Sequence, residues 1–133
     1  MNLPDTPFLS LLRERMTWLH QRQDVLSQNV ANADTPRYVA RDLKAQEFSD
    51  ALKKVTGPST SMAVTNVRHI GLSNSRPGQF EDLESPDIES SPTGNSVSLE
   101  TQMIKVSDTQ AQFAAAANLY AKAMTMMKTA IGR

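Results

Sequence analysis

Apolar residues recur every three or four positions at both ends of the chain. Near the N-terminus, Thr6 and Pro7 form a favourable helix start, and the turn signals from Asn32 to Pro36 stop the pattern. The apolar positions between them are Leu9, Leu12, Met16, Leu19, Leu26 and Val30, with Gln23 in the one gap. Because alternating spacings of three and four make a heptad seam, residues 1–33 are predicted to form a helix.

A longer seam of the same kind occupies residues 96–133. Its positions are Leu99, Met103, Val106, Phe113, Ala117, Tyr120, Met124, Met127 and Ile131, with Gln110 in the gap. Ser98 or Asn95 is expected to cap this second helix, and Gly132 to end it. A two-in-seven seam needs a partner, so the two terminal helices are predicted to pair as an antiparallel coiled-coil hairpin.

Residues 34–95 lack such a seam and contain turn signals such as Gly57-Pro58. A short helix is expected from Asp42 to Val55, and residues 61–72 loosely suit a short strand or hairpin. Five acids without an intervening base at positions 81–89 predict a solvated stretch. The fold class predicted is therefore mainly α, with an irregular middle segment in which a short β-hairpin is one option.

A second apolar stripe with a spacing of seven lies off each seam. Its members are Leu11, Trp18 and Val25 on the first helix, and Leu119 and Met126 on the second. A pair of helices buries one stripe on each, so the second stripe is expected to be exposed and to contact neighbouring subunits. The alternative is that the middle segment covers this stripe as a further core layer.

Composition narrows the possible functions. The chain has 133 residues, with 14 basic and 14 acidic side chains, no cysteine and two histidines. Zero formal charge argues against nucleic-acid binding through a global positive field. Without cysteine there are no disulfides and no cysteine-ligated metals. No apolar run approaches the length of a membrane span. We therefore predict no catalysis, cofactor, metal, small-molecule substrate or membrane span.

Three weak chemical motifs do not change this view. His69, Ser73 and Asp82 could be drawn as a catalytic triad, but no nucleophile-elbow pattern surrounds any serine. The acids at 81–89 lack the glycine and the ligand spacing of a calcium loop.

A modest basic patch is the third motif. Its members are Arg37, Arg41 and Lys44, and Asp42 interrupts it. Their charges are expected to pair across a protein interface rather than to bind nucleic acid.

One segment is more specific than any periodicity. It reads Asn29-Val30-Ala31-Asn32-Ala33-Asp34-Thr35-Pro36-Arg37-Tyr38, and it resembles the Asn-x-Ala-Asn-x-x-Thr-Pro-Gly-Tyr signature of bacterial flagellar rod and hook proteins. Residues 40–43 and 94–100, and more weakly 65–70, are similar to further elements of the proximal rod protein B family. Arg37 stands where the wider signature has glycine. Because positive φ is unfavourable for arginine, either the turn differs here or it does not need that backbone.

The resemblance implies a non-catalytic structural subunit of the proximal rod of the flagellar basal body. Such subunits polymerise helically through their terminal helices into a hollow, torque-transmitting axle in the periplasm. The implied partners are copies of the chain itself, other proximal rod proteins, and the rod adaptor protein at the inner-membrane ring and export gate. The implied route is flagellar type III export without a cleaved signal.

Five residues of the signature are expected to fix the junction between the inner helix and the outer segment. They are Asn29, Asn32, Thr35, Pro36 and Tyr38. A non-catalytic helical-hairpin chaperone or adaptor of a secretion system is the rival hypothesis from another class. An enzyme whose reaction depends on His69 is the third.

Overall fold

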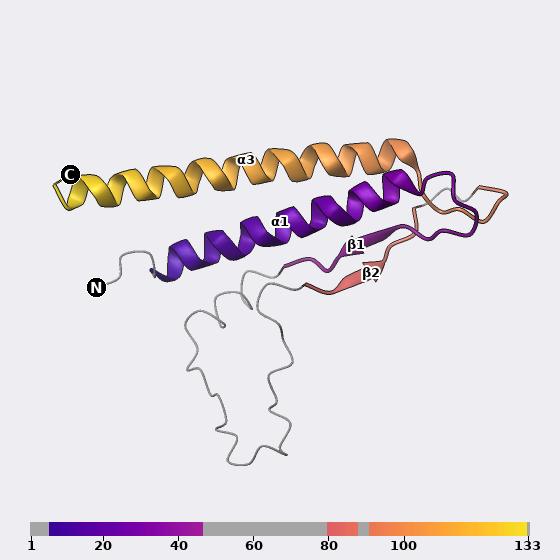
Figure 1. Ribbon diagram of the computed structural model, residues 1–133, viewed down its shortest axis with the longest axis horizontal. Helices are drawn as coiled ribbons and strands as arrows, with labels where there is room; N and C mark the ends of the chain where they lie inside the picture. The colour runs from indigo at the N-terminus through magenta and orange to yellow at the C-terminus, as the bar shows by residue number, and fades with distance from the viewer. Residues whose placement is uncertain (1–5, 47–79, 88–90, 133) are drawn as a thin grey trace, which may run out of the picture.

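Two long helices lie side by side and run in opposite directions in the computed structural model, which describes residues 6–46, 80–87 and 91–132 (Figure 1). Helix α1 spans Pro7–Ala31 and helix α3 spans Leu99–Ala130. Strands β1 (Arg41–Leu43) and β2 (Asp82–Glu84) lie on the other side of α1 from α3. The prediction of a mainly α protein with two paired terminal helices is confirmed.

The helix ends follow local chemistry. Pro7 occupies the first turn of α1 after an extended Thr6, where its missing N–H costs nothing. Ser98 caps α3, because its side-chain oxygen accepts a hydrogen bond from the backbone N–H of Thr101 at 3.5 Å. Gly132 follows α3 with a φ of +81°, which suits the residue after a helix end.

The two strands form an antiparallel pair in which Asp42 lies opposite Leu83. The pairing continues beyond the strands, since the N–H of Lys44 donates to the carbonyl of Glu81 at 3.0 Å. The helix predicted to begin at Asp42 is therefore wrong at its start: β2 supplies backbone partners, and Leu43 is buried in the core. The rest of that predicted helix beyond residue 46, and the strand-like stretch 61–72, lie outside the described residues.

The two helices meet along faces of different character. On α1, Leu9, Leu19 and Leu26 of the seam are buried, while Leu12, Met16 and Val30 are half-buried. The face that α3 turns toward α1 is centred on positions spaced by seven: Gln102, Thr109, Ala116 and Ala123.

The predicted seam of α3 does not coincide with this face. Met103 is 54% exposed. Leu99 and Ile131, at the two ends of the seam, are 52% and 57% exposed. The other apolar positions of the seam are half-buried at the flank of this face: Val106, Phe113, Ala117, Tyr120, Met124 and Met127. The reason is that polar side chains with internal partners pack as well as apolar ones: Gln102 bonds Asn29, and the Thr109 hydroxyl donates to the carbonyl of Lys105 at 2.7 Å.

The second stripe divides into two cases. On α1 the predicted exposure of Trp18 is wrong, because the strand pair covers this side chain. Only 4% of Trp18 is exposed. Its indole N–H donates to the carbonyl of Lys44 at 3.0 Å, and Leu11 and Val25 are half-buried. On α3, Leu119 and Met126 are 44% and 56% exposed. Their contact with neighbouring subunits stays a prediction.

Candidate functional site

The signature segment forms two tight turns that lead the chain from α1 into β1. The N–H of Thr35 donates to the carbonyl of Asn32 at 3.0 Å, and the N–H of Tyr38 donates to the carbonyl of Thr35 at 3.3 Å. The Asn32 side chain donates to the carbonyl of Gln28 and accepts from the Thr35 hydroxyl, at 2.8 and 3.1 Å. Pro36 is exposed and lies within the second turn, directly after Thr35. Beyond the end of α1, side-chain hydrogen bonds of the signature residues thus replace the backbone hydrogen bonds of the helix.

Arg37 adopts a left-handed backbone, with a φ of +62°. Its N–H donates to the carbonyl of Thr93 at 3.3 Å, which ties the turn to the approach to α3. Gly94 beside it has a φ of +79°. The sequence left two alternatives, that the turn differs here or that it needs no positive φ, and neither holds. Arg37 adopts the left-handed backbone that favours glycine, so this residue is conformationally strained.

Asn95 holds the signature turn from the other side of the junction. Its side-chain amide group lies 3.0, 2.7 and 2.7 Å from the carbonyls of Asn32, Ala33 and Thr35. The oxygen of the same side chain accepts from the N–H of Val97 at 2.7 Å, and the residue is 3% exposed. From the sequence, Asn95 is expected only as a helix cap. The sequence feature that could have indicated its role at the junction is the Gly94-Asn95 pair just before α3.

Asn29 is fully buried and joins both helices and β1. Its side-chain N–H groups donate to the carbonyl of Arg41 at 2.6 Å and to Oε1 of Gln102 at 2.9 Å. Its Oδ1 accepts from the N–H of Arg41 at 3.0 Å and from the Tyr38 hydroxyl at 3.2 Å. All four side-chain hydrogen-bonding positions are therefore used.

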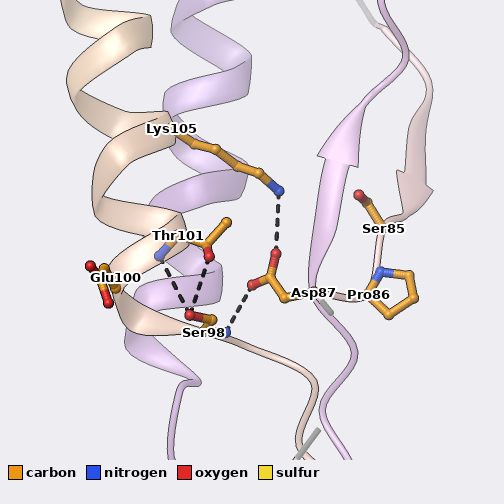
Figure 2. A pocket seen from close by; sticks show the side chains of 7 residues that line it. All are labelled: Ser85, Pro86, Asp87, Ser98, Glu100, Thr101 and Lys105. Carbon is orange, nitrogen blue, oxygen red and sulfur yellow. Dashed lines mark hydrogen bonds and ion pairs between the residues drawn. The ribbon is translucent and has the colours of Figure 1, made fainter. Parts of the chain in front are cut away.

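Asp87 extends these contacts on the α3 side (Figure 2). Its Oδ2 accepts from the N–H of Ser98 at 2.8 Å and from the side chain of Gln102 at 2.9 Å. Lys105 lies 3.5 Å from its other oxygen. The side chain is 5% exposed, so the predicted solvated acidic stretch is wrong at this position. We call Asn29, Tyr38, Gln102 and Asp87 the junction network.

The junction network borders an open pocket of about 400 Å³. Ser85, Pro86, Ser98, Glu100 and Thr101 line it together with Asp87 and Lys105 (Figure 2). No buried side-chain polar atom of the described residues lacks a hydrogen-bond partner. The polar atoms at the base of the pocket therefore serve the junction itself.

Charged side chains connect the strands to both helices. Arg22 binds Asp42 through two contacts of 2.9 and 3.0 Å, and Lys105 lies 4.0 Å from the same carboxylate. Arg41 pairs with Asp82, and Lys44 lies 4.0 Å from Glu81. For Arg41 and Lys44, the expected pairing across a protein interface is therefore corrected: Asp82 of β2 and Glu81 just before it supply the acids within the chain.

The residues of the triad that the sequence argues against lie partly outside the described residues. His69 and Ser73 lie there, while Asp82 is in β2. Across residues 6–46, 80–87 and 91–132, no three His, Asp or Glu side chains form a group able to hold a metal ion. In the same ranges, neither helix is both long and apolar enough to cross a membrane.

Comparison with known proteins points to one family. A family model described as flagella basal body rod protein matches residues 10–38. The chain is 33% identical over 111 residues to flagellar basal body rod protein FlgB of Yersinia enterocolitica, covering 79% of each chain. It is 30% identical over 125 residues to FlgB of Agrobacterium fabrum, covering 92% of this chain and 91% of that one. It is 32% identical over 112 residues to FlgB of Escherichia coli K12, covering 79% and 78%. The chain therefore belongs to the family of flagellar basal body rod proteins, as a structural subunit of the rod.

Proposed function

We propose that this chain polymerises helically in the proximal rod and that its junction network sets the geometry of each subunit. The observation that carries the proposal is the complete hydrogen bonding of the buried Asn29, which joins α1, β1 and α3. A buried polar group with all partners in place favours one arrangement, because any other leaves it unpaired. Subunits stacked into a rigid axle require such a single arrangement.

The remaining steps of the proposal concern partners, place and route. The partners are copies of the chain, other proximal rod proteins, and the rod adaptor protein at the inner-membrane ring and export gate. The place is the periplasmic rod, and the route is flagellar type III export without a cleaved signal. The subunit transmits torque and catalyses no reaction. These steps are supported by membership of the rod family and by the resemblance of the signature at residues 29–38.

Electron cryotomography of basal bodies in a strain lacking this chain tests the proposal, with a swimming assay alongside. We expect basal rings without a rod, and rods restored by the complementing gene. Complete rods with normal swimming would discard the proximal-rod proposal and favour the helical chaperone or adaptor. Both the rod subunit and the rival chaperone or adaptor are non-catalytic proteins.

The signature turn is tested separately with Pro36→Ala in the complementing gene. Pro36 restricts the backbone of the second signature turn, between Thr35 and Tyr38, so its loss should relax the junction and reduce swimming. Pro92→Ala is the matched control, since Pro92 is also exposed and in a turn but lies outside the signature. Unaltered swimming and rod length with Pro36→Ala would remove Pro36 from the proposed junction role.

A further inference from the structure

Helix α3 has a long outer face that no described part of the chain covers. In Figure 1 it lies at the edge of the molecule, with α1 along one side only. The outer face is formed by three parallel lines of exposed residues spaced by seven. The lines are Glu100, Ser107, Ala114, Ala121 and Lys128; Ile104, Ala111, Asn118 and Thr125; and Asp108, Ala115 and Lys122. Ile104, at 65% exposure, is the largest apolar side chain among them.

The charges on the outer face have opposite signs in the two halves of the helix. Glu100 and Lys128 lie on one line, four heptads apart, and their midpoint is residue 114. Asp108 and Lys122 lie on another line, two heptads apart, and their midpoint is residue 115. Both acid–base pairs are therefore centred on Ala114 and Ala115, where the side chains are smallest.

We propose that the outer face of α3 binds the same face of a second copy of this chain, antiparallel, about a two-fold axis at Ala114–Ala115. In such a pair, each outer line of residues on one helix lies along the same line of the other helix, and the two lines run in opposite directions. Glu100 then faces Lys128 of the second copy, and Asp108 faces Lys122. A parallel pair would instead place like charges together, which is unfavourable.

The packing along the centre suits this arrangement. Alanines at 111, 114, 115 and 121 allow two helix backbones to approach closely. The exposed Ile104 of each copy becomes covered near Thr125 of the other. The Asp108 carboxylate accepts a hydrogen bond from the Gln112 side chain at 2.8 Å and lies 3.9 Å from Arg22, but the Asp108 side chain is still 56% exposed. With more than half of its side chain exposed, Asp108 can also accept an ion pair from Lys122 of a second copy.

A two-fold pair has a consequence for assembly. It uses the same surface on both copies and therefore closes at two, whereas a rod requires contacts that repeat without closing. The antiparallel pair is thus a self-limited form of the chain outside the rod. It does not rest on the proposed role in the rod, and each can fail without the other.

Charge exchange in the full chain tests the proposal. Glu100→Lys leaves only positive charges at positions 100 and 128, and Lys128→Glu leaves only negative ones. Sedimentation equilibrium at low salt should show dimers of the unaltered chain, about tenfold weaker self-association for each variant, and recovery in a one-to-one mixture of the two. High salt should weaken the unaltered dimer because the ion pairs are exposed. Helix content from circular dichroism confirms that both variants fold.

Crosslinking gives the direction independently, since the chain has no cysteine of its own. Ser107→Cys and Ala121→Cys place thiols on one line at mirrored distances from the axis. A short crosslinker should join 107 to 121 in a mixture, and should not join 107 to 107. The matched charge control is Asp24→Lys, at an exposed position on α1, which should leave the dimer unchanged. A monomer at low salt, no recovery in the charge mixture, or 107-to-107 crosslinks would each overturn the proposal.

Discussion

Asn29 shows at the scale of one residue how a buried amide can join distant parts of a chain. It is separated from Gln102 by 73 positions in the sequence, yet the two side chains bond at 2.9 Å. Neither residue is exposed, so each would be costly to bury without the other. The junction network therefore specifies how α1 and α3 align at this end.

Asn29→Leu should lower the free energy of unfolding by about 3 kcal/mol, because it leaves Gln102, Tyr38 and the backbone of Arg41 without partners. Urea unfolding followed by circular dichroism measures the change. Gln28→Leu is the control on the neighbouring exposed position and should stay within about 0.5 kcal/mol. A loss below about 1 kcal/mol for Asn29→Leu would contradict the role given to the junction network.

Arg37 provides the opposite case, a residue whose replacement should stabilise the protein. Its φ of +62° is unfavourable for arginine and free of strain for glycine. Arg37→Gly should raise the free energy of unfolding by about 0.5–1 kcal/mol, after allowing for the greater freedom of glycine in the unfolded chain. Arg37→Val should lower it. If both variants destabilise the chain in urea unfolding, the left-handed turn does not carry this strain.

Helix α1 is the central element, because it is covered on two sides. One side meets α3, and the other carries Trp18 against β1 and the strand pair. The guanidinium groups of Arg15 and Arg22 lie 4.5 and 5.4 Å from the Trp18 ring centroid, distances that favour cation–π attraction. Burial, followed by the charge of Arg22, lowers the pKa of Arg15, but a guanidinium stays protonated at any working pH.

Two substitutions of Trp18 separate packing from hydrogen bonding. Trp18→Phe keeps most of the ring but loses the bond to the carbonyl of Lys44, which should cost about 1 kcal/mol. Trp18→Ala also removes the aromatic ring from the core cluster and should lower the free energy of unfolding by about 3–5 kcal/mol. Thermal and urea unfolding by circular dichroism give both values. Phe8→Ala, at a side chain that is 51% exposed, should change stability little. Equal small effects for all three would mean that the strand pair does not dock on α1.

At the scale of the whole molecule, the uneven cover of α3 matters most. Much of the stripe on α1 is covered by the strands, while Leu119 and Met126 of α3 remain exposed. Exposed apolar side chains with regular spacing are typical of surfaces that bind other proteins. In the rod, these two side chains are the ones we expect to meet neighbouring subunits.

Leu119→Ser combined with Met126→Ser should leave the helix content of the isolated chain close to unchanged, since both side chains are exposed. Swimming of the complemented strain should fall, because subunit contacts lose apolar area. Asn118→Ser with Ala121→Ser changes two other exposed positions of the same helix, and a strain that carries this variant should swim normally. Full swimming of the Leu119 and Met126 variant would show that neighbours do not use this stripe.

The sequence by itself determined the two long helices, their ends and their antiparallel pairing, because heptad spacing, caps and prolines act over a few residues. It also marked the signature turn through Asn32, Thr35 and Pro36. Only the tertiary structure decided which face of α3 meets α1, since Gln102 and Thr109 are polar and no hydropathy pattern places them inside. The burial of Trp18 and Asp87 depended in the same way on partners far along the chain. Local spacing predicts elements, whereas the burial of polar groups depends on hydrogen-bond partners that only the folded chain brings together.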